Sequence, residues 1–189
     1  MPRLILKTPP ATEPITVPQA KVHLRIDDND NDASIGVMIQ SARSGVEAFL
    51  KSAIMPTVYQ LKLDCFPGEI EFPIGPVTTA DGFAINYAND AGADTVLNSS
   101  LYQIALGEYA VVRPSFGNTW PVTRTQLDAV TVEFKAGYDD ATKIPPAIIG
   151  ALYMWLGDLF ENRESTAMDG SALPLPTGIR NLLMPFVRH

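Results

Sequence analysis

Four charged side chains at the end of an apolar run form the first group that could carry out chemistry. The segment 157–166, GDLFENREST, places Asp158, Glu161, Arg163 and Glu164 within about two helical turns. Such a group could be an active site, a metal site or the solvated end of a buried helix. On a helix, Arg163 falls in the apolar sector, whereas Asp158 and Glu161 extend the opposite side. We therefore interpret the segment as a helix end. We expect Arg163 to bind a partner in the chain or in a neighbouring subunit.

The acidic run at 27–32, DDNDND, resembles a calcium-binding loop in composition. An EF-hand loop requires glycine at its sixth position and glutamate at its twelfth, and neither reading frame of this run has them. We predict a solvated turn without metal, in which Asp30 or Asp32 caps the following helix.

Candidate nucleophiles and bases are few. The histidines are His23 and His189, and the single cysteine is Cys65, which we place in the inward phase of a strand as a buried thiol. No GxSxG, GxGxxG, P-loop, HExxH or CxxC motif is present. The sequence therefore predicts a protein that is not an enzyme, with no catalytic residues, no cofactor and no metal. A small hydrolase or a metal-dependent enzyme is the alternative from a different class.

Composition limits the partners of the chain. Its 189 residues suffice for one domain, or for a domain with a large insertion, and 46% of them are hydrophobic. A formal net charge of −7 argues against a surface that grips the DNA backbone. The single cysteine excludes an internal disulfide and fits a reducing compartment. We expect no signal peptide at residues 1–6, whose apolar run is too short, and we expect the apolar run 144–160 to be a buried helix, because it is too short to span a membrane.

Helical patterns flank the middle of the chain. Thr16 and Gln19 form a capping box that predicts a short helix ending near Ile26. A second helix should extend from about 32 to 53, with Glu47 and Lys51 as an exposed i,i+4 pair on its outer face. Its apolar stripe comprises Ile35, Ile39, Ala42, Val46, Phe49 and Leu50.

Between about 57 and 137 the apolar period changes to two, with turn residues between the runs, which indicates short antiparallel strands. The predicted fold is α+β: a helical bundle core, made of N-terminal helices and a buried C-terminal helix, with an inserted antiparallel β segment. We expect a single domain over 1–189. Its parts are N-terminal helices at 16–54, a β insertion at 57–138, a buried helix at 145–166 and a C-terminal segment at 173–189.

The predicted buried helix has no clearly polar face, which favours a subunit contact on one side. The candidate interface residues on its stripe of mostly small side chains are Gly150, Ala151, Met154 and Gly157, and Arg163 at the end of the helix is a further candidate. A further candidate is Trp120, in the loop-like segment 113–124. An exposed tryptophan often anchors an interface; alternatively, Phe116 and Trp120 fold back over an open sheet edge.

Six blocks, in this order, resemble the head–tail connector (head-completion adaptor) proteins of long-tailed double-stranded DNA phages, prophages and gene-transfer agents. Together they span about residues 16–188. The blocks are 18–27 (PQAKVHLRID) with the acidic turn and 33–35 (ASI), 113–124 (RPSFGNTWPVTR), 130–138 (VTVEFKAGY), 144–146 (IPP), Tyr153 with 161–163 (ENR), and 178–183 (GIRNLL).

The resemblance implies a structural role at the head–tail junction of a virion, assembled in the host cytoplasm. Such adaptors form a ring, expected to be dodecameric, which docks under the portal protein and presents a surface to a tail-side completion protein. DNA would pass through the lumen without specific binding, and the isolated protein could be a monomer. The resemblance also implies that the C-terminal segment contacts the portal, with candidate contacts Arg180, Leu182, Leu183 and Phe186. The alternative within the same assembly is a tail-side completion protein.

Overall fold

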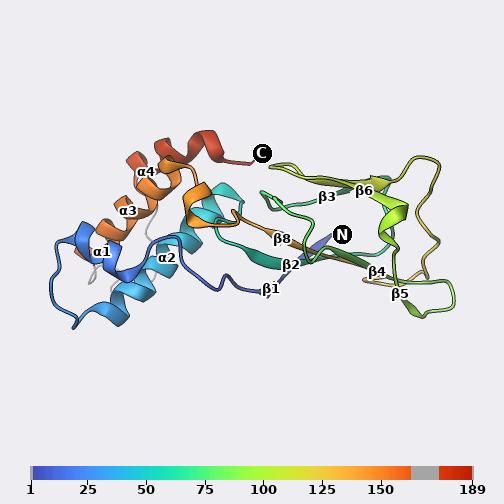
Figure 1. Ribbon diagram of the computed structural model, residues 1–189, viewed down its shortest axis with the longest axis horizontal. Helices are drawn as coiled ribbons and strands as arrows, with labels where there is room; N and C mark the ends of the chain where they lie inside the picture. The colour runs from blue at the N-terminus through green and yellow to red at the C-terminus, as the bar shows by residue number, and fades with distance from the viewer. Residues whose placement is uncertain (1, 163–174, 189) are drawn as a thin grey trace. The chain divides into compact units, whose positions relative to one another are not determined.

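The structure, a computed structural model, describes residues 2–162 and 175–188. The chain divides into two compact units. The β unit comprises Met1–Ala11 and Met55–Asp139, and the helical unit comprises Thr12–Ile54 and Asp140–His189 (Figure 1). The chain therefore passes from one unit to the other three times, and each unit is described separately below.

The helical unit contains the α-helices of the described residues. They are α1 (Val17–Leu24), α2 (Asp32–Leu50), α3 (Pro146–Glu161) and α4 (Thr177–Leu183), with short 3-10 turns η2 (Ala141–Lys143) and η4 (Met184–Phe186). The predicted capping box begins α1: Thr16 Oγ1 accepts a hydrogen bond from the Gln19 N–H, and Gln19 Oε1 accepts one from the Thr16 N–H. This confirms the predicted start of the first helix.

Helix α2 buries the stripe that its sequence predicts. Ile35, Ile39, Ala42, Val46 and Leu50 are all buried. The predicted cap of this helix is wrong. The N-cap is Asn31, no side chain caps the helix, and Asp32 instead accepts a hydrogen bond from Lys21.

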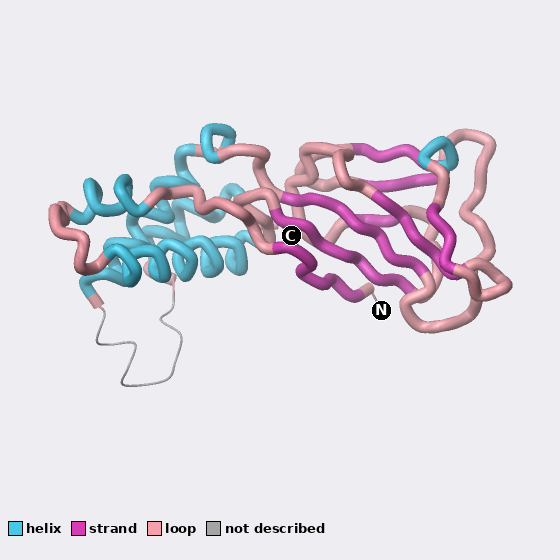
Figure 2. Tube along the Cα trace, turned by 60° about the horizontal axis from the view of Figure 1, so that its bottom comes forward, coloured by secondary structure: helices cyan, strands magenta, loops and turns pink. Residues whose placement is uncertain are grey.

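The β unit contains two antiparallel sheets. The larger sheet has the order β1-β2-β8-β4-β5, and the smaller sheet has the order β3-β7-β6 (Figures 1 and 2). The larger sheet consists of β1 (Arg3–Thr8), β2 (Thr57–Leu63), β8 (Val130–Ala136), β4 (Ala84–Ala88) and β5 (Asp94–Val96). The smaller sheet consists of β3 (Ile70–Glu71), β7 (Val111–Pro114) and β6 (Tyr102–Ala105), the last preceded by the 3-10 turn η1 (Ser99–Leu101).

An aromatic and aliphatic core joins the two sheets. The ring of Phe134 on β8 lies 4.4 Å from that of Phe72, which directly follows β3. Phe72 also contacts Phe83 edge-on, and both Ile85 on β4 and Val112 on β7 are fully buried. Alternate residues of β8 are buried, as the period of two predicts. The β unit therefore has an apolar core of its own.

The predicted helical bundle core with an inserted β segment is wrong. The helices form one of two units, and the strands build a two-sheet unit with its own core instead of a thin insertion. That unit also recruits β1, which lies outside the predicted 57–138 segment and pairs with β2. The alternation of residues 3–8 was too short to identify a strand, because its pairing partner lies more than fifty residues away in the sequence.

Cys65 also differs from the prediction. Strand β2 ends at Leu63, so the alternation does not extend to Cys65, and its side chain is exposed instead of buried. Over the described ranges 2–162 and 175–188, no helix combines the length and the apolar character needed to cross a membrane.

Candidate functional site

The small-residue side of α3 packs against other helices of its own unit. A Cβ at Gly150 would lie 3.8 Å from Leu182 Cδ2 on α4, and one at Gly157 would lie 4.0 Å from His23 Nε2 on α1. Ala151 is completely buried, whereas Met154 is 48% exposed. Of the predicted interface residues on this helix, Met154 thus offers the most accessible apolar surface within the part of the chain that the structure describes.

The described end of the GDLFENREST segment has the geometry of a helix end. Asn162 Nδ2 donates hydrogen bonds to the Asp158 carbonyl oxygen, at 3.0 Å, and to Asp158 Oδ1, at 3.1 Å. Glu161 is exposed. Arg163 and Glu164 lie outside the described residues, so the predicted partner of Arg163 remains a prediction.

The described residues considered for catalysis belong to different units. The His23 ring packs on Tyr153 of α3, with ring centroids 4.8 Å apart, whereas Cys65 belongs to the β unit. Within residues 2–162 and 175–188, no group of three or more histidine, cysteine, aspartate or glutamate side chains is arranged to hold a metal ion.

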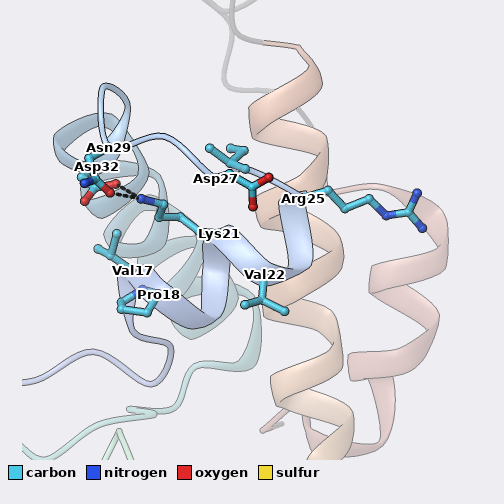
Figure 3. A pocket seen from close by; sticks show the side chains of 9 residues that line it. Val17, Pro18, Lys21, Val22, Arg25, Asp27, Asn29 and Asp32 are labelled. Carbon is cyan, nitrogen blue, oxygen red and sulfur yellow. Dashed lines mark hydrogen bonds and ion pairs between the residues drawn. The ribbon is translucent and has the colours of Figure 1, made fainter.

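A hollow beside α1 and the acidic turn is lined by Val17, Val22 and Arg25, among other residues (Figure 3). Lys21 Nζ donates hydrogen bonds to Asn29 Oδ1, at 2.5 Å, and to Asp32 Oδ1, at 2.8 Å. The positive charge of Lys21 is thereby used to hold the turn against α1.

An ion network fixes the segments on either side of α2, and the sequence analysis missed it. Arg43 donates to Glu13, at 2.7 Å, and to Glu47, at 2.6 Å, and Glu47 Oε1 accepts from the Ile54 N–H at 2.8 Å. Burial raises the pKa of Glu47, although the Ile54 N–H and Arg43 act in the opposite direction. The i,i+4 pair of the structure is Arg43–Glu47, whereas Lys51 is the left-handed C-cap of the helix.

The predicted portal contacts on α4 and η4 differ in their accessibility. Leu183 is fully buried and Arg180 is exposed, whereas Leu182 and Phe186 are half-buried. The Arg180 guanidinium lies 5.9 Å from the centre of the Phe49 ring on α2. Arg180, Leu182 and Phe186 are therefore the accessible part of this predicted surface.

The two aromatic residues of the loop after β7 have different environments. Trp120 stacks on Phe66, with ring centroids 4.8 Å apart, and its Nε1 donates to the Gly68 carbonyl oxygen at 3.3 Å. Phe116 is fully exposed. Trp120 therefore folds back on the β unit, and Phe116 does not. Trp120 also lines a groove together with Phe66, Val122 and other residues, so part of its surface remains accessible.

Comparisons with known proteins point to virus particles. Residues 14–100 match the model of the family described as "Phage gp6-like head-tail connector protein". This confirms the resemblance to head–tail connector proteins that the sequence indicated. No curated protein matches the chain.

Three similar solved structures come from gene transfer agent (GTA) particles. A chain of "Neck of empty GTA particle computed with C6 symmetry" is 20% identical, with 98% of this chain and 95% of that chain covered and a TM-score of 0.78. A chain of "Virion of native gene transfer agent (GTA) particle" is 19% identical, with 97% and 94% covered and a TM-score of 0.76. A chain of "Neck of native GTA particle computed with C12 symmetry" is 20% identical, with 99% and 94% covered and a TM-score of 0.73. The whole chain, with both of its units, therefore shares the fold of these chains.

Proposed function

We propose that this chain, whose residues 14–100 match the gp6-like head-tail connector family, is a structural protein of the head–tail junction of a virion and not an enzyme. The family match is the observation that carries the proposal. The fold supports it, because the similar chains come from particles and particle necks and are matched over almost their whole length.

The symmetry of the similar structures supports a ring. Two of them are necks computed with C6 or C12 symmetry. In a cyclic ring, each subunit contacts its neighbour through two different surfaces of the same chain. We propose a ring of twelve subunits, in which 1–189 acts as one adaptor domain. The net charge of −7 suits a channel through which DNA slides, because acidic side chains repel phosphate.

The partners within this assembly are also proposals. The portal protein would bind the C-terminal surface through Arg180, Leu182 and Phe186, with Leu183 supporting that surface from the core. The subunit interface would include Met154 and Trp120. A tail-side completion protein would bind the opposite end of the ring.

Electron microscopy of particles that lack this protein tests the proposed function. We expect DNA-filled or leaking heads without tails, and restoration of tailed particles when the protein is supplied again. Normal tailed particles in its absence would contradict the proposal. If a double His23→Ala and Cys65→Ser variant also restores tailed particles, the role does not depend on the only described histidine and cysteine side chains.

A further inference from the structure

The larger sheet of the β unit has two open edges. Its order, β1-β2-β8-β4-β5, places β1 and β5 on opposite sides, where each pairs with a single neighbouring strand of the sheet. Figure 2 shows β1 as the outermost strand on the side of the N-terminus. The outer side of an edge strand presents backbone N–H and C=O groups that another strand can bind.

Strand β1 also exposes apolar side chains. Leu4 pairs in register with Leu61, and Leu6 pairs with Tyr59. Cross-strand partners lie on the same face of a sheet. Leu61 is fully buried and Tyr59 stacks on the buried Phe134, so this is the core-facing side of the sheet. Leu4 and Leu6 extend that apolar face to the edge, where they are 36% and 56% exposed.

Features that block strand pairing lie at both ends of β1, with Pro2 directly before Arg3 and a bulge at the other end. The register is regular from Arg3 to Leu6 and shifts between Leu6 and Thr8, next to Lys7 and Pro9. Bulges, lysines and prolines are the usual means by which an edge strand is protected. The regular part is therefore short, and its length is similar to that of β5 (Asp94–Val96) at the other edge.

The two edges have opposite charges. β1 carries Arg3 and Lys7, whose side chains are 60% and 46% exposed although they bind Asp128 and Glu133 of the same unit. The β5 edge carries the exposed Asp94, close to the exposed Asp90, together with Val96, which is 70% exposed. Opposite charges favour a contact between β1 and β5 over a contact of either edge with its own copy.

We propose that β1 of one subunit pairs with β5 of the next copy of this chain in the ring, so that the larger sheets join from subunit to subunit. The inference rests on the proposed ring, and it names the two different surfaces that a head-to-tail contact requires. Because the five strands are antiparallel throughout, β1 and β5 run in the same direction. Subunits repeated around a ring have the same orientation, so the new pair is parallel. Leu6 and Thr95 then lie near the contact on the same face, because Thr95 pairs with Tyr87 and Tyr87 pairs with the buried Val130.

Cysteine cross-linking in assembled particles tests this contact. The background is Cys65→Ser, and the variants are Leu6→Cys, Thr95→Cys and the combination of the two, since Leu6 and Thr95 lie on the same face of the sheet. The combined variant should give a ladder of cross-linked multiples on a denaturing gel after oxidation or after treatment with a short thiol-reactive cross-linker. The cross-linker covers registers in which the two Cα atoms lie too far apart for a disulfide. Each single variant should remain monomeric on the gel.

Each other outcome contradicts a different part of the inference. Dimers from Leu6→Cys alone would show that like edges meet, and a cross-link to another protein would show that the edge binds a portal or tail component. Rings visible by electron microscopy without a ladder would refute the edge contact and leave the proposed function intact. Tailed particles that contain no ring of this chain would instead refute the proposed function.

A charge variant provides a second test that does not depend on cross-linking geometry. Leu6→Lys places a cation on the apolar face that Leu4 and Leu6 extend to the sheet edge. Because Leu6 is 56% exposed, the subunit should still fold. We expect at least about tenfold fewer complete particles, the factor that corresponds to about 1.4 kcal/mol. The matched control is Val37→Lys, at an exposed position of α2, which should leave the yield unchanged. Equal yields from the two variants, with equal thermal melting, would overturn the proposal.

Discussion

The ion pair between Lys7 on β1 and Glu133 on β8 helps to hold the edge strand β1 on the larger sheet. Strands β1 and β8 are not neighbours, because β2 lies between them. Lys7 Nζ donates to Glu133 Oε1, at 2.7 Å, and to Oε2, at 2.6 Å, reaching across β2 to β8. The hydrogen bond from Lys7 is the largest cause that lowers the pKa of Glu133, and Gln60 acts in the same direction. Part of the attachment of β1 therefore depends on the ionised form of Glu133.

The substitution Lys7→Met should make this dependence measurable. A lowered pKa in the folded state stabilises the fold above the ordinary pKa of glutamate, and that contribution is lost as the pH falls through the lowered value. Because both side chains are partly exposed, we expect a loss of roughly 0.5 kcal/mol in the free energy of unfolding at pH 7. The loss should approach zero at pH 3. Urea unfolding at both pH values measures it, with Lys135→Met on β8 as a control for the removal of a charge. An equal loss at both pH values would show that packing, and not charge, is responsible.

At the scale of elements, the close contact between α2 and α3 requires a glycine, Gly45, at the point where Trp155 of α3 packs on α2. A Cβ at Gly45 would overlap the Trp155 ring of α3, whereas a Cβ at Gly36, on the same helix, would meet no atom within 4 Å. Both glycines lie inside α2 (Asp32–Leu50), where alanine is intrinsically preferred by up to about 1 kcal/mol. The two positions therefore separate helix propensity from packing.

Gly45→Ala should destabilise the helical unit, whereas Gly36→Ala should stabilise it. Overpacking against Trp155 costs about 1–3 kcal/mol, which exceeds the gain in propensity and leaves a net loss of about 1 kcal/mol. Gly36→Ala should raise the free energy of unfolding by about 0.5–1 kcal/mol. Urea unfolding followed by far-ultraviolet circular dichroism measures both changes. A gain in Gly45→Ala equal to that in Gly36→Ala would contradict the close packing of the two helices.

At the scale of the whole molecule, the C-terminal surface combines a structural and a proposed binding role. Ile179 and Leu183 of α4 are buried, and the Arg188 N–H donates to the Leu50 carbonyl oxygen at 3.1 Å. Removal of the segment 173–189 would therefore take core residues away together with the proposed portal contacts. A surface substitution separates the two roles.

Arg180→Glu should weaken binding to the portal protein about tenfold, a loss of about 1.4 kcal/mol, while the chain remains folded. The reason for unchanged folding is that Arg180 is exposed and its contact with Phe49 contributes only about 0.5 kcal/mol. Co-sedimentation with portal rings measures the binding. Arg25→Glu, an equal change of charge at an exposed position of the same unit, is the control. Equal affinities of the two variants would exclude Arg180 from the portal contact.

Local features of this protein follow directly from its sequence. The capping box of Thr16 and Gln19, the buried stripe of α2 and the alternation along β8 depend on spacings of two to four residues. The order of the sequence blocks also indicated the resemblance to head–tail connector proteins, and residues 14–100 match the model of that family. Hydrogen bonds and side-chain periodicity within one element determine such features, so no tertiary information was needed.

Only the tertiary structure decided how the elements are used. The pairing of Arg3 with Lys62 makes β1 an edge strand, and the packing of Phe72 on Phe134 turns the presumed insertion into a unit with its own core. The tertiary structure also leaves Cys65 exposed and stacks Trp120 on Phe66, which is far from it in the sequence. The energies of these contacts depend on which distant segments meet, and a pattern of neighbouring residues does not contain that information. The sequence therefore determined the helices, several strands and the resemblance to head–tail connector proteins, and the fold determined which side chains of each unit are exposed.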